Sequence, residues 1–235
     1  MKRRKTASAD TIHENGPPEV RSQFRFKTQA QREAWDVISK NHITFLLGEA
    51  GVGKTQVAIA WAVQAVNRGE YEEIIQTRPA VEAGEMLGFL PGDINSKLMP
   101  YMTPLTKCGQ KVPNQETVKR ETIPLAYMRG VTFENAVCIL DESQNCTMGN
   151  LKLYISRMGE GSRLIIAGDT EQADIRDSGL AEVARELSGI PGIGVFHFRP
   201  EDTVRHPLLV QILKHPVWKK PDNRAHGRRR SPGGE

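Results

Sequence analysis

Short apolar runs that alternate with helical segments dominate the pattern of the sequence. Five runs are too short for helices, and each is followed by polar residues or glycine, as buried parallel strands are. They are segments 43–47, 73–77, 136–140, 163–167 and 194–198. Helical spacing of apolar residues predicts helices over 29–40, 57–66, 151–158 and 179–187. Strands that alternate with helices predict a parallel sheet covered on both faces. The pattern therefore predicts one α/β domain with five core strands.

The two ends and one internal stretch depart from this alternation. Residues 1–22 are polar and include a Gly-Pro-Pro breaker, so we expect a flexible lead-in. Residues 23–218 are predicted to form the single domain, and residues 219–235 a basic disordered tail. The stretch 80–130, with several Pro and Gly residues, is predicted to be an insertion between strands.

The net charge of +4 comes from the two ends of the chain. Residues 1–10 carry +3 and residues 219–235 carry +4, which leaves −3 on the body between them. Basic segments attract nucleic acid by releasing counterions, without reading its sequence. Solvated, disordered ends explain the same charge equally well, so charge alone does not choose between the two.

Composition predicts a cytoplasmic protein without membrane association. No stretch approaches the roughly 20 apolar residues of a membrane span, and polar residues follow the basic N-terminus where a secretory signal has an apolar run. Cys108, Cys138 and Cys146 are odd in number and lack C-x-x-C spacing. That pattern argues against a disulfide framework or a zinc site and favours a reducing compartment.

The strongest chemical signal is a glycine-rich loop after the first predicted strand. Residues 48–55 fit the pattern G-x-x-x-x-G-K-[ST] in full, between an apolar strand and a helix. Such a loop surrounds phosphates with backbone N–H groups. The alternative, a glycine-rich turn without function, does not explain its position between an apolar strand and a helix. Lys54 is expected to reach the β- and γ-phosphates of ATP, and Thr55 to offer its hydroxyl to Mg²⁺. The residues expected to bind the nucleotide are Gly48, Glu49, Ala50, Gly51, Val52, Gly53, Lys54, Thr55 and Gln56.

Two further signals follow predicted strands. Asp141 and Glu142 come directly after segment 136–140, where they would reach the same sheet edge as the phosphates. We expect Asp141 to hold Mg²⁺ and Glu142 to polarise the attacking water. After segment 163–167, Gln172 is a candidate for sensing the γ-phosphate. The alternative for this region is an N-cap, in which Asp169 or the next residue starts the following helix.

Phosphoryl transfer also calls for a fixed positive charge on the transferred phosphate. Arg78, Arg129, Arg199 and Arg205 all lie near predicted strand ends or loops, and their spacing does not choose among them.

These motifs resemble the PhoH family of P-loop ATPases from about residue 29 to residue 215. Besides the loop, the matching blocks are 77–85 with 87–93, 124–130, 139–145, 168–172 and 204–207. The blocks between 77 and 130 are particular to PhoH proteins. One departure is Ser143, where the family usually has alanine.

The resemblance implies a RecA-like P-loop NTPase fold, because PhoH domains are similar to the first motor domain of superfamily 1 helicases. It also implies ATP hydrolysis coupled to RNA or single-stranded DNA. By the same resemblance, Gln31 reads the adenine, Gln172 senses the γ-phosphate and Arg205 is the arginine finger. Arg78 falls where such helicases contact a single strand.

A superfamily 1 helicase closes two motor domains around one ATP, whereas this chain has room for one. Arg205 would then act on a neighbouring subunit's nucleotide, or on its own through a local fold-back. The resemblance therefore implies a homo-oligomer, with a hexameric ring as one form.

The stretch 80–130 offers further nucleic-acid candidates. Phe89, Tyr101 and Tyr127 could stack on bases, and Lys97 and Arg129 could hold phosphates. Aromatic residues in an insertion are more often packing anchors, which is the favoured interpretation.

Three functions fit the motifs. The leading one is an ATP-driven enzyme that remodels or unwinds RNA or single-stranded DNA. The second is an ATP-binding switch that acts on a protein partner. A small-molecule kinase is disfavoured, because Glu142 suits water activation and no Arg-rich lid follows the sheet.

Overall fold

The strands form one parallel sheet in the computed structural model, which describes residues 24–79, 112, 114–215 and 217. Their order across the sheet is β3-β2-β4-β5-β1-β6, and every pairing is parallel. The strands are β1 (Ile43–Leu47), β2 (Glu73–Thr77), β3 (Arg120–Thr122), β4 (Ala136–Leu140), β5 (Arg163–Gly168) and β6 (Ile193–His197). This is the RecA-like arrangement, in which β5 separates the loop-bearing β1 from the acid-bearing β4.

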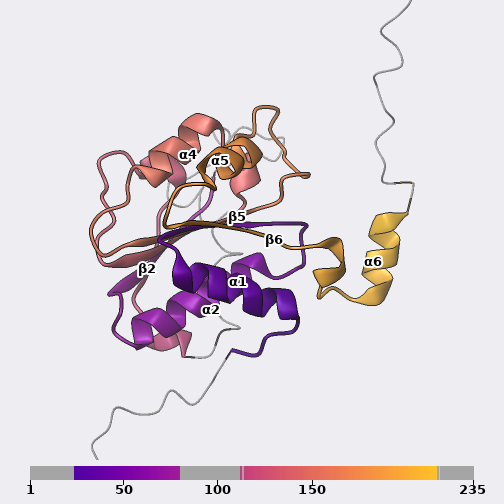
Figure 1. Cartoon of the computed structure of the whole chain (residues 1–235), viewed down its shortest axis with the longest axis horizontal. Helices are drawn as coiled ribbons and strands as arrows, with labels where there is room; N and C mark the ends of the chain where they lie inside the picture. The colour runs from indigo at the N-terminus through magenta and orange to yellow at the C-terminus, as the bar shows by residue number, and fades with distance from the viewer. Residues whose placement is uncertain (1–23, 80–111, 113, 216, 218–235) are drawn as a thin grey trace, which may run out of the picture.

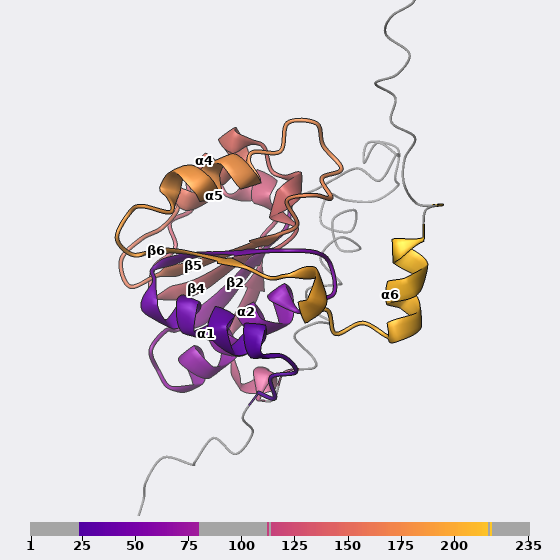
Figure 2. The same ribbon diagram turned by 45° about the vertical axis from the view of Figure 1, so that its right-hand side comes forward.

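Helices cover both faces of the sheet. One layer holds α1 (Gln29–Lys40) and α2 (Lys54–Asn67), and the other holds α4 (Met148–Ile155) and α5 (Leu180–Leu187) (Figure 1). Helix α6 (Pro207–Lys214) stands apart from both layers in the two views (Figure 2). Short 3-10 turns complete the order: η2 (Gln115–Thr117), η3 (Leu125–Tyr127), η4 (Ser143–Asn145) and η5 (Pro200–Asp202).

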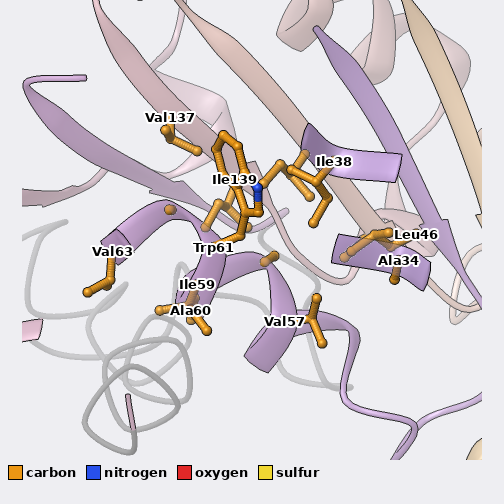
Figure 3. Close-up of a cluster of buried hydrophobic side chains, with 14 of the residues drawn as sticks. Ala34, Ile38, Leu46, Val57, Ile59, Ala60, Trp61, Val63, Val137 and Ile139 are labelled. Atoms are coloured by element: carbon orange, nitrogen blue, oxygen red, sulfur yellow. The ribbon is translucent and has the colours of Figure 1, made fainter. Parts of the chain in front are cut away.

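Alternation along the strands divides the core between the two layers. Leu46 and Ile139 face the layer of α1 and α2, where Trp61 and Ile38 pack beside them (Figure 3). Neighbouring strand residues such as Phe45 face the opposite layer instead. Burying one such side chain contributes about 1.5–3 kcal/mol. The two layers therefore hold the ends of the strands, and the loops they carry, in fixed positions.

The helix ends explain how the loops are placed. Helix α1 begins after Thr28, whose hydroxyl accepts a hydrogen bond from the backbone N–H of Gln31 at 3.2 Å. Helix α2 begins after Gly53, which adopts a left-handed conformation with φ 95°. Because nine of its residues are buried, α2 is held under the sheet along most of its length.

The sheet has six described strands where the pattern predicted five. The additional strand β3 pairs with β2 and lies inside the stretch predicted to be an insertion. It is three residues long and largely exposed, so an apolar pattern could not reveal it. Helix α6 was not predicted either, and α2 and α4 each begin three residues earlier than expected.

Several predictions fall outside the described residues. They concern the flexible lead-in over 1–22, the tail over 219–235, and Phe89, Lys97, Tyr101 and Cys108. Within the described part of the chain, no helix combines the length and apolar character that crossing a bilayer demands.

Candidate nucleotide-binding site

The glycine-rich loop connects the end of β1 to the start of α2 and depends on its glycines. Gly51 and Gly53 have φ values of 96° and 95°, a region that side chains disfavour. A Cβ at Gly53 would lie 2.6 Å from Nε2 of Gln31, and a Cβ at Gly51 would collide with the side chain of Arg205. Conformation and space therefore both exclude larger residues at these two positions.

Lys54 folds back across this loop. Its Nζ donates to the carbonyl oxygens of Gly48 at 2.6 Å and Glu49 at 2.9 Å. Burial lowers the pKa of Lys54, while the carboxylates of Asp169 and Asp141 oppose that shift. The ammonium group therefore lies in a field of acidic side chains, within the loop that would bind phosphates.

The two predicted magnesium ligands meet. The hydroxyl of Thr55 donates to Oδ1 of Asp141 at 2.7 Å, although 86 residues separate them. Asp141 is buried at the end of β4, and Thr55 lies in the first turn of α2. Hydroxyl and carboxylate oxygens are the donors that Mg²⁺ prefers, so this pair fits the ion.

Arg78 occupies the other side of Asp141. Its Nη2 and Nε lie 2.8 and 3.2 Å from Oδ2 of Asp141, and Nη2 also lies 3.1 Å from Oε1 of Glu142. The resemblance placed Arg78 on a single strand of nucleic acid. In the structure its guanidinium lies against the acid pair, with the side chain 17% exposed, and the contact with a single strand stays a prediction.

Glu142 is held by a second side chain, which the sequence analysis did not single out. Nε2 of Gln144 donates to Oε2 of Glu142 at 2.6 Å, and Oε1 of Gln144 accepts from the backbone N–H of Asp169 at 3.0 Å. Gln144 thereby joins the end of β4 to the end of β5. A polar residue two positions after the acid pair was the only signal for this role.

Asp169 belongs to the site, and the N-cap alternative is wrong. The next helix, α5, begins eleven residues later and has Gly179 at its N-cap position. Oδ1 of Asp169 accepts from the N–H of Glu171, whereas the buried Oδ2 has no hydrogen-bond partner among the described residues. Asp169 is also the acid with the largest effect on the pKa of Lys54.

Gln31 is not among the residues that line the cavity described below, and its contact with adenine stays a prediction from the resemblance. Its side chain is fully buried. Nε2 donates to the carbonyl of Val52 at 3.0 Å, and Oε1 accepts from the N–H of Lys27 at 2.8 Å. Both ends of the amide group are thus hydrogen-bonded within the protein, and the bond to Val52 holds Gln31 against the glycine-rich loop.

Arg205 lies on the loop of its own chain. The N–H of Val204 donates to the carbonyl of Gly51 at 2.9 Å, and the Arg205 side chain covers Gly51. Its charge also lowers the pKa of Lys54. Arg205 thus contacts the glycine-rich loop of its own chain, and its role as the arginine finger stays a prediction.

The remaining arginine candidates lie elsewhere. Arg129 is exposed beyond η3, and Arg199 is exposed at the start of η5. Neither borders the cavity described below.

A cavity of about 340 Å³ lies between these elements. That volume is within the range of small-molecule sites. Gln172 borders it but is exposed. The residues predicted to bind the nucleotide that line it are Ala50, Gly51, Gly53, Lys54, Thr55 and Gln56. Asp141 and Glu142 also line it.

Known proteins share this sequence over most of its length. The family model described as PhoH-like protein matches residues 23–215. The chain is 44% identical over 201 residues to a PhoH-like protein of Bacillus subtilis, covering 81% of this chain and 63% of that protein. It is 39% identical over 199 residues to protein PhoH of Escherichia coli, covering 80% and 56%. The chain thus spans about three-fifths of the length of these relatives.

A solved structure agrees with the fold. The large terminase of a thermophilic bacteriophage matches with a TM-score of 0.52 at 13% identity, covering 82% of this chain and 50% of that one. At this identity the likeness concerns the fold alone. Sequence identity and the family match together show that the chain belongs to the family of PhoH-like proteins.

Proposed function

We propose that the chain binds ATP with Mg²⁺ and hydrolyses it. The observation that carries this proposal is the contact of Thr55 with Asp141 at 2.7 Å, in a cavity that Lys54 also lines. These groups come from separate elements of the chain, and a glycine turn without function would not require them to converge.

Each side chain has a role that follows from its position. Thr55 and Asp141 would hold the magnesium ion, which neutralises charge on the phosphate oxygens when bound. Lys54 would exchange its two carbonyl partners for phosphate oxygens. The Glu142 side chain is 45% exposed and borders the cavity, so its carboxylate can orient a water molecule. Arg205 would stabilise charge on the transferred phosphate from within the same chain.

Two variants test hydrolysis. Glu142→Gln should keep nucleotide binding and lower kcat by about 10²–10⁴-fold, because the amide cannot accept the water's proton. Lys54→Ala should lose nucleotide affinity as well, measured by equilibrium binding of a fluorescent ATP analogue. The exposed residues Lys40 and Glu160 provide the matched controls Lys40→Ala and Glu160→Gln. Unchanged turnover in Glu142→Gln would contradict the assigned role.

We further propose that hydrolysis is coupled to RNA or single-stranded DNA. The exposed Tyr127 and Arg129 support this, because they lie in or directly after η3, where the N–H of Leu125 donates to the carbonyl of Arg78 at the end of β2. The basic ends of the sequence support it through charge. Turnover should rise several-fold when single-stranded RNA or DNA is added. Turnover that is indifferent to every strand would favour the alternative, an ATP-binding switch acting on a protein partner.

We also propose that the chain self-associates through α6. Leu208 and Leu209 on α6 are 57% and 40% exposed, on a helix that stands apart from both layers (Figure 2). Exposed apolar residues gathered on one helix are typical of contact surfaces. Since Arg205 already reaches its own loop, this proposal does not depend on a shared active site.

A cytoplasmic location remains a prediction from the sequence.

A further inference from the structure

Both oxygens of the Asp141 carboxylate already have partners within the chain. Oδ1 accepts the Thr55 hydroxyl at 2.7 Å, and Oδ2 accepts Nη2 and Nε of Arg78 at 2.8 and 3.2 Å. The Asp141 side chain is only 4% exposed, so water does not compete strongly for it. A carboxylate oxygen has two lone pairs, and Arg78 therefore uses both lone pairs of Oδ2.

Thr55 occupies one lone pair of Oδ1 and Arg78 occupies both lone pairs of Oδ2, so this carboxylate has one lone pair left for a magnesium ion or a water bound to it. Two positive groups next to one buried carboxylate also repel each other strongly. Arg78 and Mg²⁺ consequently compete for Asp141.

We propose that Arg78 is a built-in counter-cation of the acid pair, which competes with Mg²⁺ for Asp141 and thereby raises the magnesium concentration that the site requires. This inference rests on the proposed binding of ATP with Mg²⁺. Arg78 is a positioning residue in this scheme, because it acts through the acid that holds the metal.

The backbone around Arg78 is consistent with an exchange limited to the side chain. The N–H of Asp141 donates to the carbonyl of Thr77 at 2.9 Å, and the N–H of Leu125 donates to the carbonyl of Arg78 at 3.3 Å. These bonds anchor the main chain at the end of β2, whatever the guanidinium contacts. The long side chain can therefore leave Asp141 without a change in the sheet.

The test is a magnesium titration of the full chain with a fluorescent, non-hydrolysable ATP analogue. Arg78→Gln should bind the analogue at a magnesium midpoint about threefold or more below that of the wild type, which corresponds to part of one charge-assisted hydrogen bond. Arg78→Lys, with a single point charge, should lie between them. Arg185→Gln, which removes an arginine from an exposed ion pair with Glu186, should leave the midpoint unchanged.

A second readout needs no nucleotide. The thermal unfolding midpoint should respond to Mg²⁺ alone at lower concentrations in Arg78→Gln than in the wild type. If Arg78→Gln does not fold, the lower midpoint of Arg78→Lys decides the question.

The outcomes separate this inference from the proposed function. An unchanged or higher magnesium midpoint in the Arg78 variants, with binding and hydrolysis intact, would overturn the exchange and leave the ATPase standing. Unchanged magnesium dependence with weaker binding of single-stranded RNA would assign Arg78 to nucleic acid instead. No analogue binding by the wild type at any magnesium concentration would overturn both.

Discussion

Glu142 adopts a backbone conformation that side chains usually avoid, with φ 55° and ψ 35°. Such a conformation costs roughly 1–3 kcal/mol and persists only where the surroundings hold it. Arg78 and Gln144 provide that support, each bonded to a different oxygen of the carboxylate. The strained backbone and the two contacts together fix the direction in which Glu142 presents its charge.

Removing one of these contacts should affect turnover more than binding. In Gln144→Leu, we expect kcat to fall about tenfold with little change in the KM for ATP, because Glu142 loses orientation and no phosphate contact is lost. Steady-state hydrolysis over a range of ATP concentrations measures both constants.

The control is a double-mutant cycle. In the Glu142→Gln background, Gln144→Leu should have almost no further effect on kcat, since the group it positions is already inactive. Full additivity of the two losses would mean that Gln144 acts elsewhere.

At the scale of residues, the sequence predicted the groups that belong to local motifs. Lys54, Thr55, Asp141 and Glu142 all border the cavity, as their spacing to strand ends implied. The contact of Arg78 with the acid pair could not be predicted, because it joins distant positions of the chain. Arg78 lies 63 residues before Asp141, and no local pattern marks it as a partner of that acid.

At the scale of elements, apolar periodicity located the central strands and α1 within one residue of their ends. It did not locate β3, whose residues Arg120, Glu121 and Thr122 are polar and partly or fully exposed. Pairing with β2 stabilises this strand, and such pairing is set by the sheet rather than by the strand's own sequence. Helices α2 and α4 begin before the apolar residues from which they were predicted. The first turn of α2 continues the glycine-rich loop, and the first turn of α4 follows the N-cap residue Thr147.

Two buried cysteines, Cys138 on β4 and Cys146 before α4, predict that the stability of the fold decreases at alkaline pH. Burial raises the pKa of Cys146 to about 12 and raises that of Cys138 even further above its ordinary value near 9. The folded chain therefore keeps thiol protons that the unfolded chain releases above pH 9. The free energy of unfolding should fall as pH rises from about 9 toward about 12.

Urea unfolding of the wild type and Cys146→Ala near pH 8 and pH 10 measures this effect. Since other groups also titrate in this range, the difference between the two proteins is the informative quantity. By pH 10 the wild type should lose about 1 kcal/mol more than the variant. Equal losses would show that the thiol of Cys146 titrates alike in the folded and unfolded chains.

At the scale of the whole molecule, α6 stands apart from both helix layers and leaves Leu208 and Leu209 exposed. The double variant Leu208→Glu, Leu209→Glu should reduce self-association, because it places two like charges on the exposed apolar surface. Sedimentation equilibrium should then give the mass of a single chain where the wild type is heavier.

Gln211→Glu is the matched control, since it adds a charge to the same helix and leaves both leucines in place. It should keep the mass of the wild type. A monomeric wild type at working concentration would remove the basis for an oligomer built through α6.

The position of β5 between β1 and β4 has a consequence for synthesis on the ribosome. Ile43 of β1 pairs with Leu164 and Ile193, so neither neighbour of the first strand exists until most of the chain has emerged. The glycine-rich loop is made early, but its strand stays unpaired, and Asp141 cannot be aligned with Thr55 until β5 fills the gap. A nascent chain that ends before residue 168 therefore contains the glycine-rich loop but not the assembled site. Binding of nucleotide would show that β5 has paired with both β1 and β4.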